Sequence, residues 1–359
     1  MPNNNHANKG EWSELLVFVK IAHDSFVFMC DADLNAIPSK RLRVENIIRG
    51  KTIFSTSGGD VISRKDASGV EIQIPKITLP MKIDRFTSEI ISANGVFNST
   101  WGNALLDEFQ LTKVKADSNK KADIDLTISD PKTLLLTAAG FSIKSYLGNS
   151  STLLNSSKQN TNFQFCIEGF TGDVNQINNV GGSSKIRDRI EAISKAGGRF
   201  VFSKAKGAIF GRNLMKIDSL MPSILGNLTL ANSIITKRGK KITDVVQSSE
   251  FSNLISKLPI TLDADLVAYK VKSLLLDIAL GMVPKTAWNG RQTADGGYIV
   301  VKNTGELVCF HVYNFGEFSD YLFQNTKFDT PSSTRHEYGF IYDEGSKLFF
   351  DINCQIRFI

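Results

Sequence analysis

The chain has 359 residues, of which 42% are hydrophobic and 22% are charged, and its formal net charge is +6. These values lie in the range of folded globular proteins with one large domain or two smaller ones, and they exclude a disordered chain. The positive charge would help the protein to approach a polyanion such as nucleic acid, although many basic proteins bind no anion.

The cysteines and the apolar segments indicate the cellular compartment. The four cysteines are widely spaced, with no C-x-x-C pair and no histidine at zinc-ligand spacing, which favours buried thiols in a reducing cytoplasm. The N-terminal MPNNNHANKG lacks the apolar core of a signal peptide, and the most apolar stretch, residues 266–283, is interrupted by charged residues. We therefore expect a cytoplasmic protein that contacts no membrane.

The first expected element is a helix within residues 10–29. Apolar residues such as Trp12 and Leu15 recur there at roughly the helical period. Glu11 and Glu14 then share one polar edge of that helix. Residues 40–80 mix basic and β-prone pieces and predict short strands, followed by a second helix near residues 81–92.

A pair of strands is expected next, joined by a turn at residues 130–133. In KKADIDLTISD, the polar residues Asp123 and Asp125 alternate with apolar ones, which is the period of a half-buried strand. The following LLLTAAGFSIKSYLG predicts a second strand with Ser142 and Lys144 on one side. Two carboxylates and a lysine can therefore meet across neighbouring strands.

The rest of the chain alternates polar and periodic segments. The tract NSSTLLNSSKQNTN predicts a loop or a groove-reading surface, and KIRDRIEAISKAGG predicts a helix that ends at Gly197-Gly198. Three helices, a hairpin with its turn at Thr304-Gly305, a further helix and a final hairpin follow. Their expected ranges are 211–228, 242–257, 262–283, 297–314, 317–328 and 338–358.

The change of character near residue 285 predicts a sub-domain junction. We expect residues 1–285 to form a core with helical additions, and residues 286–359 to form a hairpin-rich α+β segment.

Hydrolysis of a phosphodiester needs a metal ion, a positioned water and a nearby cation. The PD-(D/E)xK arrangement meets this need with an aspartate on one strand, an acid-x-lysine on the next strand and often a glutamate from a preceding helix. Asp123, the segment Ser142-Ile143-Lys144 and Glu14 can fill these places. A D…x-x-K pair also arises by chance in many strands, so an ordinary solvated strand face is an equal alternative.

One position departs from the pattern, because Ser142 stands where an acid is expected. The missing carboxylate can come from Glu14 or Asp125, with Glu11 and Glu168 as further candidates. Gly10-x-x-x-Glu14 resembles the start of the first helix in this superfamily, which favours Glu14.

Six blocks of the chain resemble, in order, the HpaII-like type II restriction endonucleases. They are KGEWSEL, KKADIDLTISD, GFSIKSYLG, STLLNSSKQNTNF, KIRDRIEAI and FDTPSSTRHEYG; they begin at Lys9, and the resemblance covers nearly the whole chain. The resemblance implies an α/β fold with a PD-(D/E)xK core, that is, a mixed central sheet flanked by helices. It also implies Mg²⁺-dependent cleavage of double-stranded DNA at a short palindromic site, CCGG for the namesake.

The resemblance also assigns roles to residues. It matches Asp123 to the strand aspartate, with Asp125 as the alternative, and Lys144 to the catalytic lysine. Asp123, the Ile143 carbonyl and Glu14 would hold Mg²⁺, which prefers oxygen ligands and keeps several waters. Lys144 would orient the attacking water and help to deprotonate it, and cleavage would leave 5′-phosphate and 3′-hydroxyl ends.

Base reading requires side chains that reach base edges, such as arginine for guanine and asparagine or glutamine for adenine. Within residues 332–336, Arg335 is the preferred guanine reader and His336 is its neighbour, although a turn with an exposed arginine is slightly favoured on sequence alone. The other expected readers follow the second strand, where an ordinary polar loop is about as plausible: Lys158, Gln159, Asn160 and Asn162.

A run of positive charge at residues 237–241 fits phosphate contact, which positions a protein without reading sequence. Charge runs are usually just solvated surface, so this assignment is a hypothesis. The run comprises Lys237, Arg238, Lys240 and Lys241, and Arg187, Arg189 and Arg199 would extend it.

The sequence lacks the motifs of several other classes of enzyme. The chain has no His-Asn-His module, no correctly spaced GIY-YIG pair, no phosphate-binding loop for a nucleotide cofactor and no methyltransferase tetrad. The remaining alternatives are a DNA-binding protein with a degenerate nuclease site and a structure-specific repair nuclease. A palindromic target suggests a homodimer, although small enzymes of this fold also act as monomers.

Overall fold

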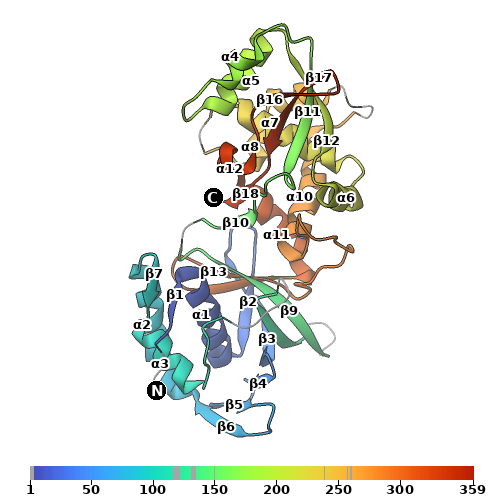
Figure 1. Ribbon diagram of the computed structural model, residues 1–359. Coiled ribbons are helices and arrows are strands. Elements are labelled where there is room, and N and C mark those ends of the chain that lie inside the picture. The colour runs from blue at the N-terminus through green and yellow to red at the C-terminus, as the bar shows by residue number, and fades with distance from the viewer. Residues whose placement is uncertain are drawn as a thin grey trace. The chain divides into compact units, whose positions relative to one another are not determined.

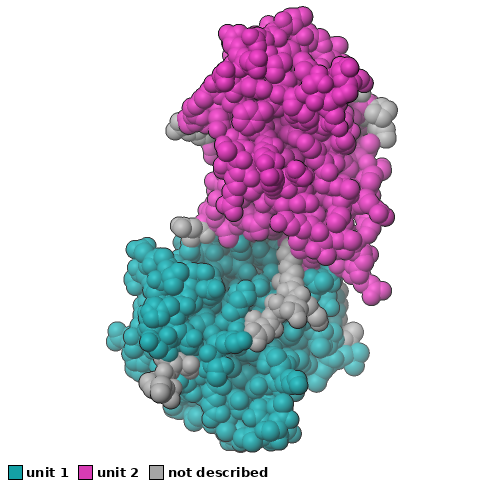
Figure 2. Space-filling view, in the orientation of Figure 1, with its two compact units in different colours: residues 1–149, 292–321 teal, residues 150–291, 322–359 magenta. Residues whose placement is uncertain are grey.

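The computed structural model of the protein describes residues 4–115, 122–130, 135–148, 150–237, 239–256, 258 and 261–359. The chain divides into two compact units (Figure 2). Unit 1 contains Met1–Asn149 and Gln292–Tyr321, and unit 2 contains Ser150–Arg291 and Leu322–Ile359. Each unit combines helices with its own β-structure (Figure 1), so the expected mixed α/β class is confirmed.

This division differs from the junction expected near residue 285. The tail does not form one unit, because its first hairpin pairs with strands of unit 1: β13 (Gly297–Val301) lies parallel to β9 (Leu136–Ser145). Residues after Tyr321 return to unit 2. The junction was expected from a change in composition, which does not reveal that a late hairpin pairs with an early strand.

Unit 1 begins with short strand β1 and helix α1. Its elements are β1 (His6–Asn8), α1 (Lys9–Asp24), β2 (Phe26–Cys30), β3 (Ala36–Arg49), β4 (Thr52–Ser55), β5 (Val61–Lys65), β6 (Glu71–Pro75), η1 (Lys76–Thr78), α2 (Leu79–Ser92), β7 (Val96–Asn98), α3 (Thr100–Glu108), β8 (Ile124–Ser129), β9, β13, β14 (Leu307–His311), η2 (Val312–Asn314) and most of α11 (Phe315–Gln324).

Among the described residues, nine strands form the main sheet, in the order β2-β14-β13-β9-β8-β3-β4-β5-β6. The long strand β3 pairs with β8 and β4 and also with β2, so six of the strands form a closed ring of pairings. The central hairpin β8–β9 is antiparallel, as expected, and Asp130 N donates to Leu135 O (2.9 Å) across its turn. The predicted turn residues 131–133 lie outside the described residues.

Helix α1 packs the apolar face that the sequence predicts. Trp12, Leu15 and Leu16 are fully buried in the core of unit 1, and Asn8 caps the helix in a capping box with Glu11. The helix ends earlier than expected, because Ser25 adopts a left-handed conformation (φ 63°). The residues after it, FVFMC, are aromatic and β-prone and form strand β2.

Unit 2 has two smaller sheets and most of the helices. Its elements are β10 (Thr152–Leu154), β11 (Asn162–Glu168), α4 (Val174–Asn178), α5 (Lys185–Lys195), β12 (Arg199–Ala205), α6 (Ala208–Ile217), α7 (Met221–Ile234), α8 (Ile242–Val246), α9 (Ser249–Ile255), α10 (Ala264–Leu280), β15 (Thr326–Phe328), α12 (Ser333–His336), β16 (Ile341–Glu344), β17 (Lys347–Asn353) and β18 (Ile356–Phe358).

The larger sheet of unit 2 has the order β12-β11-β17-β16, and the smaller has the order β10-β18-β15. Strands β11 and β12 were not predicted, because each follows a polar or glycine-containing segment. One face of the larger sheet is apolar: Phe163 contacts Phe202 and Phe210, and Gly226 of α7 lies against the Phe163 and Phe202 rings. The opposite face is polar.

Two predicted helices are each divided. The range 211–228 contains parts of α6 and α7, and 242–257 contains α8 and α9. Ser248 begins the second helix of the latter pair by accepting a hydrogen bond from Phe251 N (3.2 Å). The helix expected at 317–328 ends at Gln324, and β15 follows it. No helix within the described ranges is long and apolar enough to cross a membrane.

The final hairpin is confirmed for β16 and β17, which pair antiparallel around Gly345 and Ser346. The last strand, β18, leaves this hairpin and pairs with β10 and β15. The segment 149–162, expected as a loop, therefore contributes a strand to the smaller sheet.

Substitution of Gly297 by alanine should destabilise unit 1. Gly297 has a φ of +128°, and an added Cβ would overlap the carbonyl oxygen of Phe310 on β14. We expect the free energy of unfolding to fall by about 2–4 kcal/mol. Urea unfolding of the Gly297→Ala variant measures this change.

Gly316→Ala is the matched control, because a Cβ at this position in α11 meets nothing within 4 Å. Its unfolding free energy should stay within about 1 kcal/mol of the parent. Equal effects of the two variants would show that the space around Gly297 does not matter.

Candidate active site

The two predicted catalytic strands are neighbours, and Asp123 lies at the end of their pairing. Asp123 immediately precedes β8, and its amide donates to Phe141 O of β9 (2.8 Å). The register continues through Ile124 opposite Phe141 and Asp125 opposite Gly140. The strand pair thus places Asp123 beside the segment Ser142-Ile143-Lys144.

Two donors of β9 hold the Asp123 carboxylate. Its Oδ2 accepts a hydrogen bond from Ile143 N (2.7 Å) and another from Ser142 Oγ (3.2 Å). Ser142 is buried, so the hydroxyl that replaces the expected acid orients Asp123. Lys144 is two residues further along the strand and projects on the same side as Ser142.

Burial raises the pKa of Asp123, while the hydrogen bonds of Ile143 and Ser142 and the positive charges of Lys115 and Lys144 lower it in part. The positive charge of Lys144 thus favours the ionised form of this carboxylate.

Glu14 adds a second half-buried carboxylate. It projects from α1, and its side chain is only 15% exposed. Burial, and next the negative charge of Asp123, raise the pKa of Glu14 to about 7, although Lys115 acts in the opposite direction. Lys115 Nζ lies 3.4 Å from Oε1, whereas the buried Oε2 has no hydrogen-bond partner among the described residues.

Glu14, Asp123 and Asp125 line one small cavity of about 40 Å³. This volume exceeds the roughly 10–15 Å³ that one water-sized sphere occupies. Asp125 is exposed at the cavity, and a Cβ on the facing Gly140 would lie 3.2 Å from Asp125 Oδ1. The cavity therefore brings together all three acids that the sequence analysis ranked first.

The oxygen atoms around this cavity suit a magnesium ion that takes few of its ligands from the protein. Within the described ranges, no group of three or more His, Cys, Asp or Glu side chains is arranged to hold a metal ion by itself. Mg²⁺ is usually bound by one or two carboxylates together with waters and substrate phosphates. The Ile143 N–H points to Asp123, so the Ile143 carbonyl points to the same edge of β9. Its oxygen can therefore act as a further metal ligand. The observation that favours a cation here is the Glu14 Oε2 atom, which has no hydrogen-bond partner among the described residues.

Two further acids are used elsewhere. The Glu11 carboxylate accepts a hydrogen bond from Asn8 N (3.0 Å) and so caps α1. Glu168 belongs to unit 2 and forms an ion pair with Arg199 (3.6 Å). Neither lines the cavity with Asp123.

Sequence reasoning missed Arg49 and Lys115. Arg49 Nη2 donates to the carbonyl oxygens of Lys113 (2.6 Å) and Val114 (2.7 Å), which places Lys115 beside Glu14. These contacts join positions more than 60 residues apart, and no spacing in the sequence indicates them. In the sequence, the lysines of the KVK segment (residues 113–115) are the one feature that could have indicated a cation near Glu14.

Comparisons with known proteins bear on this arrangement. The family model described as "HpaII restriction endonuclease" matches residues 8–358. The chain is also 35% identical to the type II restriction enzyme HpaII of Haemophilus parainfluenzae, over 98% of both chains. The chain belongs to the HpaII restriction endonuclease family. Membership makes it an enzyme, a site-specific deoxyribonuclease. No solved structure matches it.

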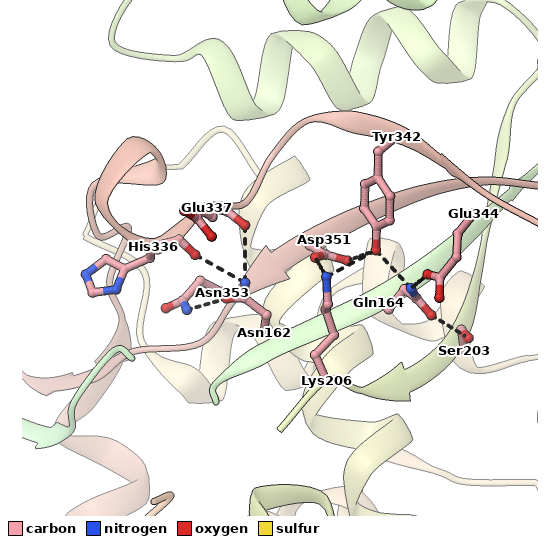
Figure 3. Close-up of polar contacts among 10 residues, drawn as sticks. All are labelled: Asn162, Gln164, Ser203, Lys206, His336, Glu337, Tyr342, Glu344, Asp351 and Asn353. Atoms are coloured by element: carbon pink, nitrogen blue, oxygen red, sulfur yellow. Dashed lines mark hydrogen bonds and ion pairs between the residues drawn. The ribbon is translucent and has the colours of Figure 1, made fainter. Parts of the chain in front are cut away.

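In this HpaII family member, the two segments expected to read bases lie side by side in unit 2 (Figure 3). Ser156 Oγ lies 3.1 Å from His336 Nε2, and Lys158 Nζ lies 2.5 Å from Glu337 Oε1. Asn162 Nδ2 donates to the carbonyl oxygens of His336 (3.2 Å) and Glu337 (3.3 Å). Residues about 175 positions apart thus form one surface.

The expected base readers differ in exposure. Arg335, Lys158 and Gln159 are exposed, while Asn160 is half-buried and donates to Ser157 Oγ (3.0 Å). Asn162 is fully buried, and its Oδ1 accepts from Asn353 Nδ2 (2.5 Å). Asn162 therefore does not fit the expected role of base reader, because both ends of its amide are used inside the unit.

The basic run is only partly available to phosphate. Lys237 pairs with Asp244 (3.2 Å), and Lys240 Nζ donates to Ile235 O (2.8 Å), while Lys241 is exposed. Arg238 lies outside the described residues.

Three arginines were expected to extend the basic run. Arg187 lines the same hollow of about 320 Å³ as Lys237 and Lys240. Arg189 is buried, and its guanidinium donates to three backbone carbonyls, so it does not fit a phosphate-contacting role. Arg199 is exposed and pairs with Glu168.

Glu14→Gln should stabilise the metal-free protein at alkaline pH. The Glu14 pKa is 4.5 in the unfolded reference and about 7 in the fold, so its stabilising contribution is complete below pH 4.5 and is lost as the pH rises through 7. We expect Glu14→Gln to raise the unfolding free energy by roughly 1–3 kcal/mol at about pH 8 in chelator, and to change it little at about pH 5.

Urea unfolding at the two pH values measures this difference. Glu11→Gln is the control, because it removes one carboxylate from the same helix and retains the capping hydrogen bond. It should change stability equally at both pH values. If Glu14→Gln does the same, the cavity does not desolvate Glu14.

Proposed function

We propose that this enzyme hydrolyses phosphodiester bonds in double-stranded DNA at a short palindromic site, with a target similar to CCGG, and that it requires Mg²⁺. The products would be 5′-phosphate and 3′-hydroxyl ends. The supporting observation is the small cavity at the start of β8, where Asp123 and Glu14 lie together, both half-buried, and Lys144 contributes positive charge.

Each residue of the site has a separate task in this proposal. Asp123, Glu14 and the Ile143 carbonyl would hold Mg²⁺, and Asp125 is the additional carboxylate at the opening. The bound ion would neutralise the negative charge that develops on the phosphorus oxygens. Ser142 would orient Asp123 through their hydrogen bond.

Lys144 would position the attacking water. The water oxygen forms a bond to phosphorus while the bond from phosphorus to the 3′ oxygen breaks, and the 3′ oxygen leaves with a proton. The ammonium group of Lys144 favours hydroxide character on the water, because a nearby positive charge stabilises the deprotonated form. These tasks match the PD-(D/E)xK pattern, and the mixed sheet with β8 and β9 at its centre supports that fold assignment.

Unit 2 would recognise the DNA. Its exposed side chains Arg335, Lys158 and Gln159 would reach base edges, His336 would support them, and Lys237, Lys240 and Lys241 would contact phosphates. The tail 286–359 contributes Arg335 and His336 to this surface. A palindromic site suits a symmetric dimer of two copies of the chain.

A second candidate is a family member that binds DNA without cutting it. The observation that favours it is Ser142, because the pattern then lacks one acid. The half-buried Glu14 supplies a carboxylate to the same cavity, which favours catalysis.

Asp123→Asn and Lys144→Ala should each abolish most cleavage. Loss of a metal ligand should lower the rate by about a thousandfold, and loss of the lysine by about a hundredfold or more. Plasmid cleavage with and without Mg²⁺ measures both effects, and chelation with EDTA should stop the parent enzyme until Mg²⁺ is restored.

Asp60→Asn and Lys51→Ala remove the same charges from exposed positions of unit 1 and should cleave at the parental rate. If Lys144→Ala nicks plasmid as fast as these controls, Lys144 is not catalytic. If the parent cuts no DNA in Mg²⁺ but binds it, the second candidate is correct.

Arg335→Ala and a triple variant of Lys237, Lys240 and Lys241 to glutamine should separate base reading from phosphate contact. Arg335→Ala should reduce discrimination against single-base changes in the site. The triple variant should weaken binding to all sequences alike and reduce its salt dependence by about one released ion for each lysine removed. Binding titrations over a range of salt concentrations measure both. If Arg335→Ala weakened binding to all sequences alike and the triple variant lost discrimination, the roles assigned to Arg335 and to the three lysines would both be wrong.

A further inference from the structure

Lys206 lies on the polar face of the larger sheet of unit 2, at the end of β12, and the sequence analysis did not select it. Its Nζ donates to Asp351 Oδ2 on β17 (2.6 Å) and lies 3.4 Å from Tyr342 Oη on β16 (Figure 3). The Tyr342 hydroxyl donates to Asp351 Oδ1 (2.7 Å). Two side chains, one from β17 and one from β16, therefore fix the position of the ammonium group.

The surroundings of Lys206 are rigid. Asp351 is 3% exposed, and burial raises its pKa, although Lys206 opposes this effect. The neighbouring Gln164 is also buried and uses its whole amide: it donates to Tyr342 Oη (2.8 Å) and Glu344 Oε2 (2.9 Å), and it accepts from Ser203 Oγ (3.0 Å). A lysine held in this way loses little further conformational freedom when it binds a ligand.

Lys206 also opens onto a pocket of about 170 Å³. The pocket walls include Gln159 from the first expected reading segment and Glu337, which directly follows the second. Tyr338 and Phe340 add aromatic surface. Lys206 thus brings a positive charge to the point where the two reading segments meet.

The chemistry of this pocket suits a base edge better than a phosphate. An ammonium group has three N–H donors, and among the described residues Asp351 and Tyr342 account for two of them. The carboxylates of Asp351 and Glu337 line the same pocket, and their negative charge disfavours an anion. The major-groove edge of guanine is uncharged and presents two acceptors, O6 and N7, which lysine commonly contacts.

We propose that Lys206 determines sequence specificity by donating its remaining N–H to the O6/N7 edge of one guanine in the recognition site. The inference rests on the proposed function, because it identifies what unit 2 reads during site-specific cleavage. Asp351 and Tyr342 are positioning residues that aim the ammonium group.

The test substitutes Lys206→Met and measures kcat/KM on a set of short duplexes. The site is first located by sequencing the ends of a cleaved plasmid, and each base pair of it is then changed in turn. We expect Lys206→Met to lower kcat/KM on the cognate duplex about tenfold to a hundredfold and to lose discrimination at one G·C pair, with the other positions unchanged. Lys206→Arg, which keeps the donors, should retain the preference for guanine.

Lys204→Met is the matched control. Lys204 is an exposed lysine of β12 that lies opposite Gln164 in the strand register, and its loss should leave discrimination intact at every position. Tyr342→Phe keeps the ring and removes one hydrogen bond to Asp351, so it should give a smaller loss at the same G·C pair as Lys206→Met. Thermal unfolding of each variant reports its folding. If Lys206→Met does not fold, the double variant Lys206→Met/Asp351→Asn, which removes both charges of the ion pair, takes its place in the test.

The outcomes separate the explanations. Equal weakening on all duplexes, with a smaller salt dependence, would mean a phosphate contact and would overturn the proposal. Unchanged discrimination together with a lower unfolding temperature would mean a purely structural ion pair and would also overturn it. Failure of the parent enzyme to cut any duplex would instead refute the proposed function.

Discussion

The central constraint in this protein is the burial of two carboxylates in one small cavity. Asp123 is fixed by the Ile143 amide and the Ser142 hydroxyl, and Glu14 approaches from α1 with one oxygen unpartnered among the described residues. Removing two negative charges from water is costly unless a cation compensates for them. Lys115 compensates in part, through an ion pair of 3.4 Å with Glu14. Strand pairing, the position of α1 and the hydrogen bonds of Arg49 together bring these charged groups to one place.

The local part of the site was predictable from the sequence, and the rest was not. Alternation in KADIDLTIS and GFSIK predicted the strands and the shared side of Ser142 and Lys144, because strand periodicity is a local property. Contacts such as that of Arg49 with Val114 depend on the fold of the whole unit. Strand β11 also alternates apolar and polar residues, but it begins at the end of the polar tract that was expected to be a loop, and its partners lie on β12 and β17.

Unit 2 shows how buried polar groups can shape the proposed recognition surface without contacting a ligand. Asn162 and Asn353 are hydrogen-bonded to each other inside the unit, and Asn162 also binds the carbonyls that follow α12. A buried amide that is fully hydrogen-bonded defines one conformation, because any shift leaves a polar group unsatisfied. The residue that sequence reasoning expected to read a base therefore holds together the two segments that present the exposed candidates.

The chain passes between the two units three times, after Asn149, Arg291 and Tyr321. Neither unit is therefore a continuous stretch of polypeptide. A gene segment encoding a different unit 2 could not be joined to unit 1 by a single recombination event, since unit 2 consists of two separate stretches of the chain. If unit 2 recognises the DNA, as proposed, new target preferences would arise more readily by point substitutions within unit 2 than by the exchange of whole domains.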